Sequence, residues 1–126
     1  MFDVIELPPV PTSVATARKW SGEVIERVGA GQLADTIALL VSELVSNAVL
    51  HAQTVCWLRI ASVPGRVRVE VEDQSNELPG DVSMPGPLAT SGRGLALVDA
   101  LSVEYGVVTV APSGKRIWFE LETNGF

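Results

Sequence analysis

Apolar residues recur along the chain at two different spacings, and each spacing predicts a kind of element. In residues 14–28 and 33–52 they recur every three or four positions, which is typical of amphipathic helices. In residues 1–7 and 66–73 they alternate with polar residues, which is typical of strands with one buried face. A third helix is expected over residues 91–101. The helix over 33–52 has the widest apolar face, so we expect it to lie in the core.

Turn residues separate the remaining strand-like runs into two hairpins. Their runs are 54–62 with 66–73, joined by Pro64 and Gly65, and 103–110 with 115–123, joined by residues 112–114. Helices against such strands predict an α+β fold, a two-layer α/β sandwich. Its mixed, mostly antiparallel sheet would be covered on one face by three helices. A length of 126 residues predicts one domain over residues 1–126.

Several residues mark where the elements begin and end. Thr12 or Ser13 is expected to cap the first helix, and Gly29 to stop it. From residue 74 to residue 90 no period is found, and prolines and glycines interrupt the segment. A loop of this length in a small domain is usually functional.

Composition and charge narrow the classes of function. The formal net charge is −6, and a general nucleic-acid binder relies on a basic surface, so direct nucleic-acid binding is not expected. One cysteine, Cys56, forms no internal disulfide and is expected to be a small buried hydrophobe. The N-terminus lacks the basic region of a signal peptide, and no uncharged apolar stretch is long enough for a membrane span. We expect a soluble cytoplasmic protein with no membrane partner.

Three polar residues follow one another at intervals of four in the second predicted helix. Glu43, Asn47 and His51 would lie at about 0°, 40° and 80° around its axis. The carboxylate can deprotonate a hydroxyl, and the amide oxygen can bind a hard cation such as Mg²⁺. A polar, solvent-facing helix stripe is the alternative interpretation.

Two further signals come later in the chain. Asp73 ends an alternating strand and by parity points inward, where a carboxylate needs a donor such as the exocyclic amine of a purine. The alternative is an Asp that starts a turn. Gly92 and Gly94, with Arg93 between them, precede a helical pattern, and phosphates bind at such helix starts. The alternative there is a flexible entry to the helix. In this order, the three signals indicate a nucleotide site.

Five blocks of the sequence are similar to those of a known family: ELPPVPTSVATARKW, ELVSNAVLHA, VEVEDQSNELP, GRGLALVDAL and SGKRIWFEL. They resemble the GHKL-type (Bergerat) ATP-binding domains, and most of all the small bacterial anti-sigma-factor serine/threonine kinases in their short actinomycete form. The resemblance covers nearly the whole chain. The Glu-xxx-Asn block is its most specific part.

The resemblance implies a role for each matching residue. Glu43 would be the general base for the attacking hydroxyl, Asn47 would bind the Mg²⁺ of ATP, and Asp73 would take the adenine amino group. Residues 74–90 would form a lid over the nucleotide, and His51 would pack or support the site residues rather than take part in catalysis. The remaining nucleotide contacts would be Ser75, Pro79, Gly92, Arg93, Gly94 and Leu95.

The resemblance also implies a function. Such proteins use ATP and Mg²⁺ to phosphorylate a serine of an anti-anti-sigma (STAS-type) partner, and they sequester a sigma factor when that partner is modified. They often work as homodimers. Two alternatives stay open: a module that sequesters a protein partner without kinase turnover, and the detached ATP-binding domain of a histidine kinase.

Two positions depart from the pattern of the family. Ser75 stands where the family commonly has Gly, which permits a closer backbone approach. Arg116 stands where relatives often have a Thr that helps to fix adenine. Both departures favour the sequestering module. Lys115 and Arg116 are expected to form a solvated turn.

Overall fold

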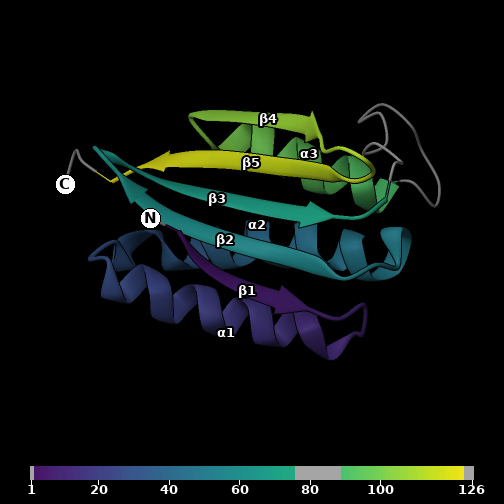
Figure 1. Ribbon diagram of the computed structural model, residues 1–126. Helices are drawn as coiled ribbons and strands as arrows, with labels where there is room; N and C mark the ends of the chain where they lie inside the picture. Colours follow the sequence, from purple (N-terminus) through teal and green to yellow (C-terminus); the bar gives the residue numbers. More distant parts are fainter. Residues whose placement is uncertain (1, 76–88, 124–126) are drawn as a thin grey trace.

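A computed structural model gives the fold and describes residues 2–75 and 89–123. Its helices and its sheet form two layers (Figure 1). The elements are β1 (Asp3–Leu7), α1 (Thr12–Arg27), a 3₁₀ turn (Gly31–Leu33), α2 (Ala34–Asn47), a π-helical turn (Ala48–Ala52), β2 (Cys56–Val63), β3 (Arg66–Asp73), α3 (Ala89–Leu101), β4 (Glu104–Thr109) and β5 (Lys115–Glu122).

The five strands form one sheet in the order β1-β2-β3-β5-β4, and each pair of neighbours is antiparallel. The helices cover one face of this sheet (Figure 1). The predicted α+β two-layer sandwich is therefore confirmed, with antiparallel rather than mixed pairing. Because β5 lies between β3 and β4, the last of the described strands is inside the sheet.

Helix α2 is the central element of the core. Its apolar face is buried against α1, α3 and the sheet, through Ile37, Leu40, Val41, Leu44 and Val45. The sheet meets it with alternate residues of β3 and β5, which are Val67, Val69, Val71, Ile117, Phe119 and Leu121. The prediction that the wide apolar face of this helix lies in the core is therefore confirmed.

The helical run Gly31–Ala52 is long and apolar enough to cross a membrane, with a mean hydropathy of 1.6. By length and composition alone it qualifies as a candidate span. Its packing gives another reason for the apolar character, because the buried side chains of α2 form the centre of the domain core. The run also carries Asp35 and Glu43.

The start of α1 differs from its prediction. Thr12 is the first residue of the helix, Pro11 is the cap position, and no side chain among the described residues caps it. The Ser13 hydroxyl instead donates a 2.7 Å hydrogen bond to the carbonyl of Pro8, which fixes the turn before the helix. The end of α1 agrees with its prediction, since Gly29 has a φ of +81°, which favours glycine.

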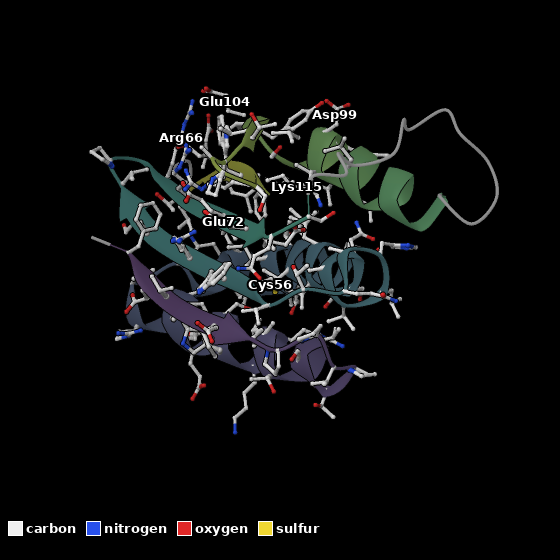
Figure 2. The ribbon with its side chains drawn as sticks, turned by 45° about the vertical axis from the view of Figure 1, so that its right-hand side comes forward. Cys56, Arg66, Glu72, Asp99, Glu104 and Lys115 are labelled. Carbon is white, nitrogen blue, oxygen red and sulfur yellow. The ribbon has the colours of Figure 1, made fainter. Side chains whose placement is uncertain are left out.

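The other face of the sheet carries a ladder of arginine–glutamate pairs. Arg68 joins Glu70 at 2.8 Å and Glu120 at 2.9 Å, and its guanidinium lies 4.1 Å from the centre of the Trp118 ring. Arg66 joins Glu104 at 2.8 Å, and Figure 2 shows these two residues together. Arg68 and Glu70 thus lie on the face away from the helices, as the alternation in residues 66–73 predicts. Glu70 is nevertheless buried by its neighbours.

Candidate functional site

Four segments of the chain lie toward the same end of the domain (Figure 1). They are the C-terminal end of α2, the end of β3, the start of α3 and the start of β5. Two contacts tie this end together: β3 and β5 are in register at Asp73 and Lys115, and the backbone N–H of Gln74 donates to the Thr54 hydroxyl at 3.0 Å. The predicted site residues thus come from neighbouring segments at this end.

Glu43 and Asn47 lie one turn apart within α2, as their spacing predicts. Asn47 is the last residue of that helix before its geometry changes. Its Oδ1 atom is buried and has no hydrogen-bond partner among the described residues. A buried amide oxygen without a partner is unfavourable, and a hard cation is a suitable partner for it. The structure therefore fits a cation at Asn47.

Contrary to the prediction, His51 does not continue the polar stripe of Glu43 and Asn47. A π-helical turn begins directly after Asn47 and covers Ala48–Ala52. A π-turn has more residues per turn than an α-helix, so the 100° step fails after Asn47. His51 is exposed. Gln53 closes the turn with a left-handed φ of 57°. Such π-turns are frequent at functional sites.

Asp73 points inward, as its parity predicts, and is only 6% exposed. Its donor is Lys115, whose Nζ lies 2.9 Å from Oδ2 and 3.1 Å from Oδ1. The backbone N–H of Ser75 also donates to Oδ1, at 2.9 Å. The carboxylate that the sequence assigns to a purine amine thus has a charged donor within the chain.

The predicted solvated turn at Lys115 and Arg116 is wrong. Lys115 is the first residue of β5 and is only 8% exposed. Arg116 points to the opposite face of the sheet, where its Nη2 atom lies 2.8 Å from Glu72 Oε1. Two adjacent residues of a strand face opposite sides, so only one of them can face the site. The residue opposite Asp73 is Lys115 rather than Arg116.

Sequence reasoning missed Lys115 although its signal is present in the chain. Lys115 has the same parity as the buried residues Ile117, Phe119 and Leu121 of β5. That alternation, extended by one step, places Lys115 on the inner face. The turn residues 112–114 directly before Lys115 led to its assignment to the turn instead of to the alternating strand.

Cys56 lies beside the same carboxylate, because it pairs with Asp73 across β2 and β3. It is buried, as predicted, and lies at the same end of the sheet as Lys115 (Figure 2). Burial and, after it, the negative charge of Asp73 raise the pKa of the Cys56 thiol to about 11. The thiol is therefore protonated at neutral pH and is no nucleophile there.

The predicted phosphate-binding residues are described only in part. Gly92, Arg93 and Gly94 lie within α3, which begins at Ala89, two residues before the predicted start. The side chain of Arg93 lies outside the described part of the structure, as do Pro79 and most of the predicted lid over residues 74–90. Leu95 is half-buried in α3.

A metal ion here would have few ligands from the protein. Within residues 2–75 and 89–123, no group of three or more His, Cys, Asp or Glu side chains could hold a metal ion. A cation at Asn47 would therefore take its other ligands from water or from a bound anion, as Mg²⁺ commonly does with phosphates.

Comparison with known proteins identifies the family. The model of the histidine kinase-like ATPase domain family matches residues 7–121. The chain belongs to this family. It is a GHKL-type ATP-binding domain, of a family that typically binds ATP with Mg²⁺. A search of curated proteins finds no match.

A solved structure supports the same fold. The histidine kinase domain from the Erythrobacter litoralis EL346 blue-light activated histidine kinase aligns with a TM-score of 0.56 and 25% sequence identity. The alignment covers 89% of this chain and 60% of that chain. The chain thus spans about 60% of the length of the solved structure that it matches.

Proposed function

We propose that the protein is an ATP- and Mg²⁺-dependent serine/threonine kinase that acts in the cytoplasm as an anti-sigma factor by partner switching. The observation that carries the proposal is the pair on α2, where Glu43 precedes by one turn an amide oxygen of Asn47 that lacks a partner within the described residues. The expected partners are an anti-anti-sigma (STAS-type) protein and a sigma factor, and a homodimer is the expected assembly.

Glu43 and Asn47 would have different roles in phosphoryl transfer. ATP with Mg²⁺ supplies the phosphoryl group and neutralises its charge. The Asn47 Oδ1 atom would hold the cation from the protein side, and the Glu43 carboxylate would accept the proton of the serine hydroxyl. Phosphoryl transfer needs mainly positioning and electrostatic stabilisation, so a small domain with few functional side chains is sufficient.

The proposal is tested by phosphate transfer from labelled ATP to a STAS-type protein that carries a serine acceptor. Glu43→Gln removes the base, and we expect transfer to fall by about 100-fold or more. The control is Glu23→Gln, which changes an exposed residue of α1 and leaves transfer unchanged. Undiminished transfer by the Glu43→Gln variant contradicts the assigned base.

The ion pair at Asp73 supports a second candidate, a module that sequesters its partner without kinase turnover. Lys115 already supplies a charged donor to the carboxylate that would recognise adenine. Under this proposal the wild type and the Glu43→Gln variant capture the partner equally, and neither transfers phosphate. Calorimetry separates the two candidates, because only the kinase needs measurable binding of ATP with Mg²⁺ at millimolar nucleotide.

The chemical nature of any phosphorylated product tests the third alternative, a histidine kinase domain. Phosphohistidine is labile in acid, whereas phosphoserine is stable. We expect an acid-stable product on the partner. An acid-labile product instead supports transfer to histidine, the activity for which the matched Erythrobacter litoralis protein is named.

A further inference from the structure

Lys115 is held next to Asp73 by the backbone. The preceding residue, Gly114, has a φ of +128°, and a Cβ atom there would lie 2.5 Å from the carbonyl oxygen of Asp73. Only a residue without a side chain allows this approach. The close contact between the two backbones places the first residue of β5 directly opposite the last residue of β3.

Burial strengthens the contact between the two side chains. Asp73 is 6% exposed and Lys115 is 8% exposed, so water screens the pair little. The ammonium lies within hydrogen-bond distance of both carboxylate oxygens, and Oδ1 also accepts the Ser75 N–H. A charged donor forms a stronger bond to a carboxylate than a neutral donor does.

A purine amine that approaches Asp73 is such a neutral donor. It would have to displace the ammonium of Lys115 or share Oδ2 with it. Displacement leaves a buried ammonium without its carboxylate, which is unfavourable. The conformation with a free carboxylate is therefore a minor one, and the apparent dissociation constant rises as the population of the competent conformation falls.

We infer that Lys115 is an internal competitor for Asp73 and weakens the recognition of purines that carry an exocyclic amine. The inference rests on the proposed nucleotide site and assigns to one residue the control of its base recognition. Lys115 is a specificity-determining residue and takes no part in phosphoryl transfer.

The test compares the binding of ATP with Mg²⁺ to the wild type, Lys115→Thr and Arg116→Thr by calorimetry. Lys115→Thr removes the ammonium and keeps a small polar side chain suited to a strand. We expect it to bind at least about tenfold more tightly than the wild type. Arg116→Thr makes the same change of charge one residue later, on the other face of the sheet, and should bind within about twofold of the wild type.

A second ligand isolates the role of the amine. Inosine triphosphate has the same phosphates as ATP but a carbonyl in place of the exocyclic amine. The gain of Lys115→Thr should therefore be lost with inosine triphosphate. An equal gain with both nucleotides overturns the assignment to the base.

A second variant and a measurement on the wild type keep the test valid if Lys115→Thr does not fold. Lys115→Met keeps most of the aliphatic stem and should also tighten ATP binding. The chain has two lysines, Lys19 and Lys115. In the wild type, the side-chain nitrogen resonance of Lys115 should shift on addition of ATP with Mg²⁺, while that of the exposed Lys19 stays in place.

The outcomes distinguish this inference from the proposed function. ATP binding by the wild type with equal or weaker binding by both Lys115 variants overturns the inference alone. The inference alone is also overturned if ATP binds while the side-chain nitrogen resonance of Lys115 stays in place. Failure of every protein to bind ATP overturns both the inference and the proposed kinase.

Discussion

The Cys56 thiol links the stability of the domain to pH. Burial, together with the negative charge of Asp73, raises its pKa from 9.0 to about 11. The folded state therefore keeps this proton at a pH where the unfolded chain has lost it. The resulting stabilisation is complete below pH 9 and is lost as the pH rises to 11.

We expect Cys56→Ala to flatten this alkaline loss. In the wild type, the thiol lowers the free energy of unfolding by about 2 kcal/mol between pH 9 and pH 11. The variant is less stable at neutral pH because it leaves a cavity, but it lacks this part of the slope. Denaturant unfolding at several pH values measures both. If the free energy of unfolding falls equally with pH in both proteins above pH 9, the assignment of this loss to Cys56 is wrong.

At the residue scale, parity predicted more than residue type did. The inward direction of Asp73 followed from the alternation of β3, and the burial of Cys56 followed from its apolar surroundings. The donor for Asp73 could not be obtained from residue type, because a lysine after a turn is usually solvated. The contact depends on the register of two strands that are distant in sequence.

At the scale of elements, the hairpin of β4 and β5 contains one position that only glycine fits. Gly114 combines a positive φ with a close approach to the end of β3. The hairpin therefore fixes the position of Lys115 as well as the edge of the sheet.

We expect Gly114→Ala to lower the free energy of unfolding by about 2–4 kcal/mol, because the new methyl group meets a backbone carbonyl and the dihedral is unfavourable. The matched control is Gly22→Ala in α1, where a Cβ meets nothing within 4 Å. That change should stabilise the protein by about 0.5–1 kcal/mol. Denaturant unfolding of both variants measures the contrast. Equal effects would show that the space around Gly114 does not matter.

The π-turn shows what periodicity leaves out. The apolar pattern of residues 33–52 predicted one continuous α-helix, and the chain is indeed helical there. The change of pitch after Asn47 is invisible to the pattern, because the three apolar residues that follow it, Ala48, Val49 and Leu50, suit both geometries. His51 was misplaced for this reason.

At the scale of the whole molecule, the candidate site depends on both layers. Asn47 belongs to the helical layer, whereas Asp73 and Lys115 belong to the sheet. A ligand that contacts both layers stabilises the folded domain as a unit.

We therefore expect ATP with Mg²⁺ to raise the free energy of unfolding by about 1.4 kcal/mol at ten times the dissociation constant. Excess EDTA removes Mg²⁺ and should reduce this stabilisation of the wild type. In Asn47→Ala the stabilisation by the nucleotide should be the same with and without EDTA, because the amide oxygen that holds the cation is missing. Thermal unfolding with each ligand provides the measurement. A full response to Mg²⁺ in the variant would contradict the assigned ligand.

The strand order also bears on how the protein is made. Among the five described strands β5 is synthesised last, yet it lies between β3 and β4. Until residues 115–122 have emerged, β3 has an unpaired edge in the nascent chain and β4 has no neighbour. The five-stranded sheet is therefore completed from its interior, and Asp73 meets Lys115 only once β5 has been made.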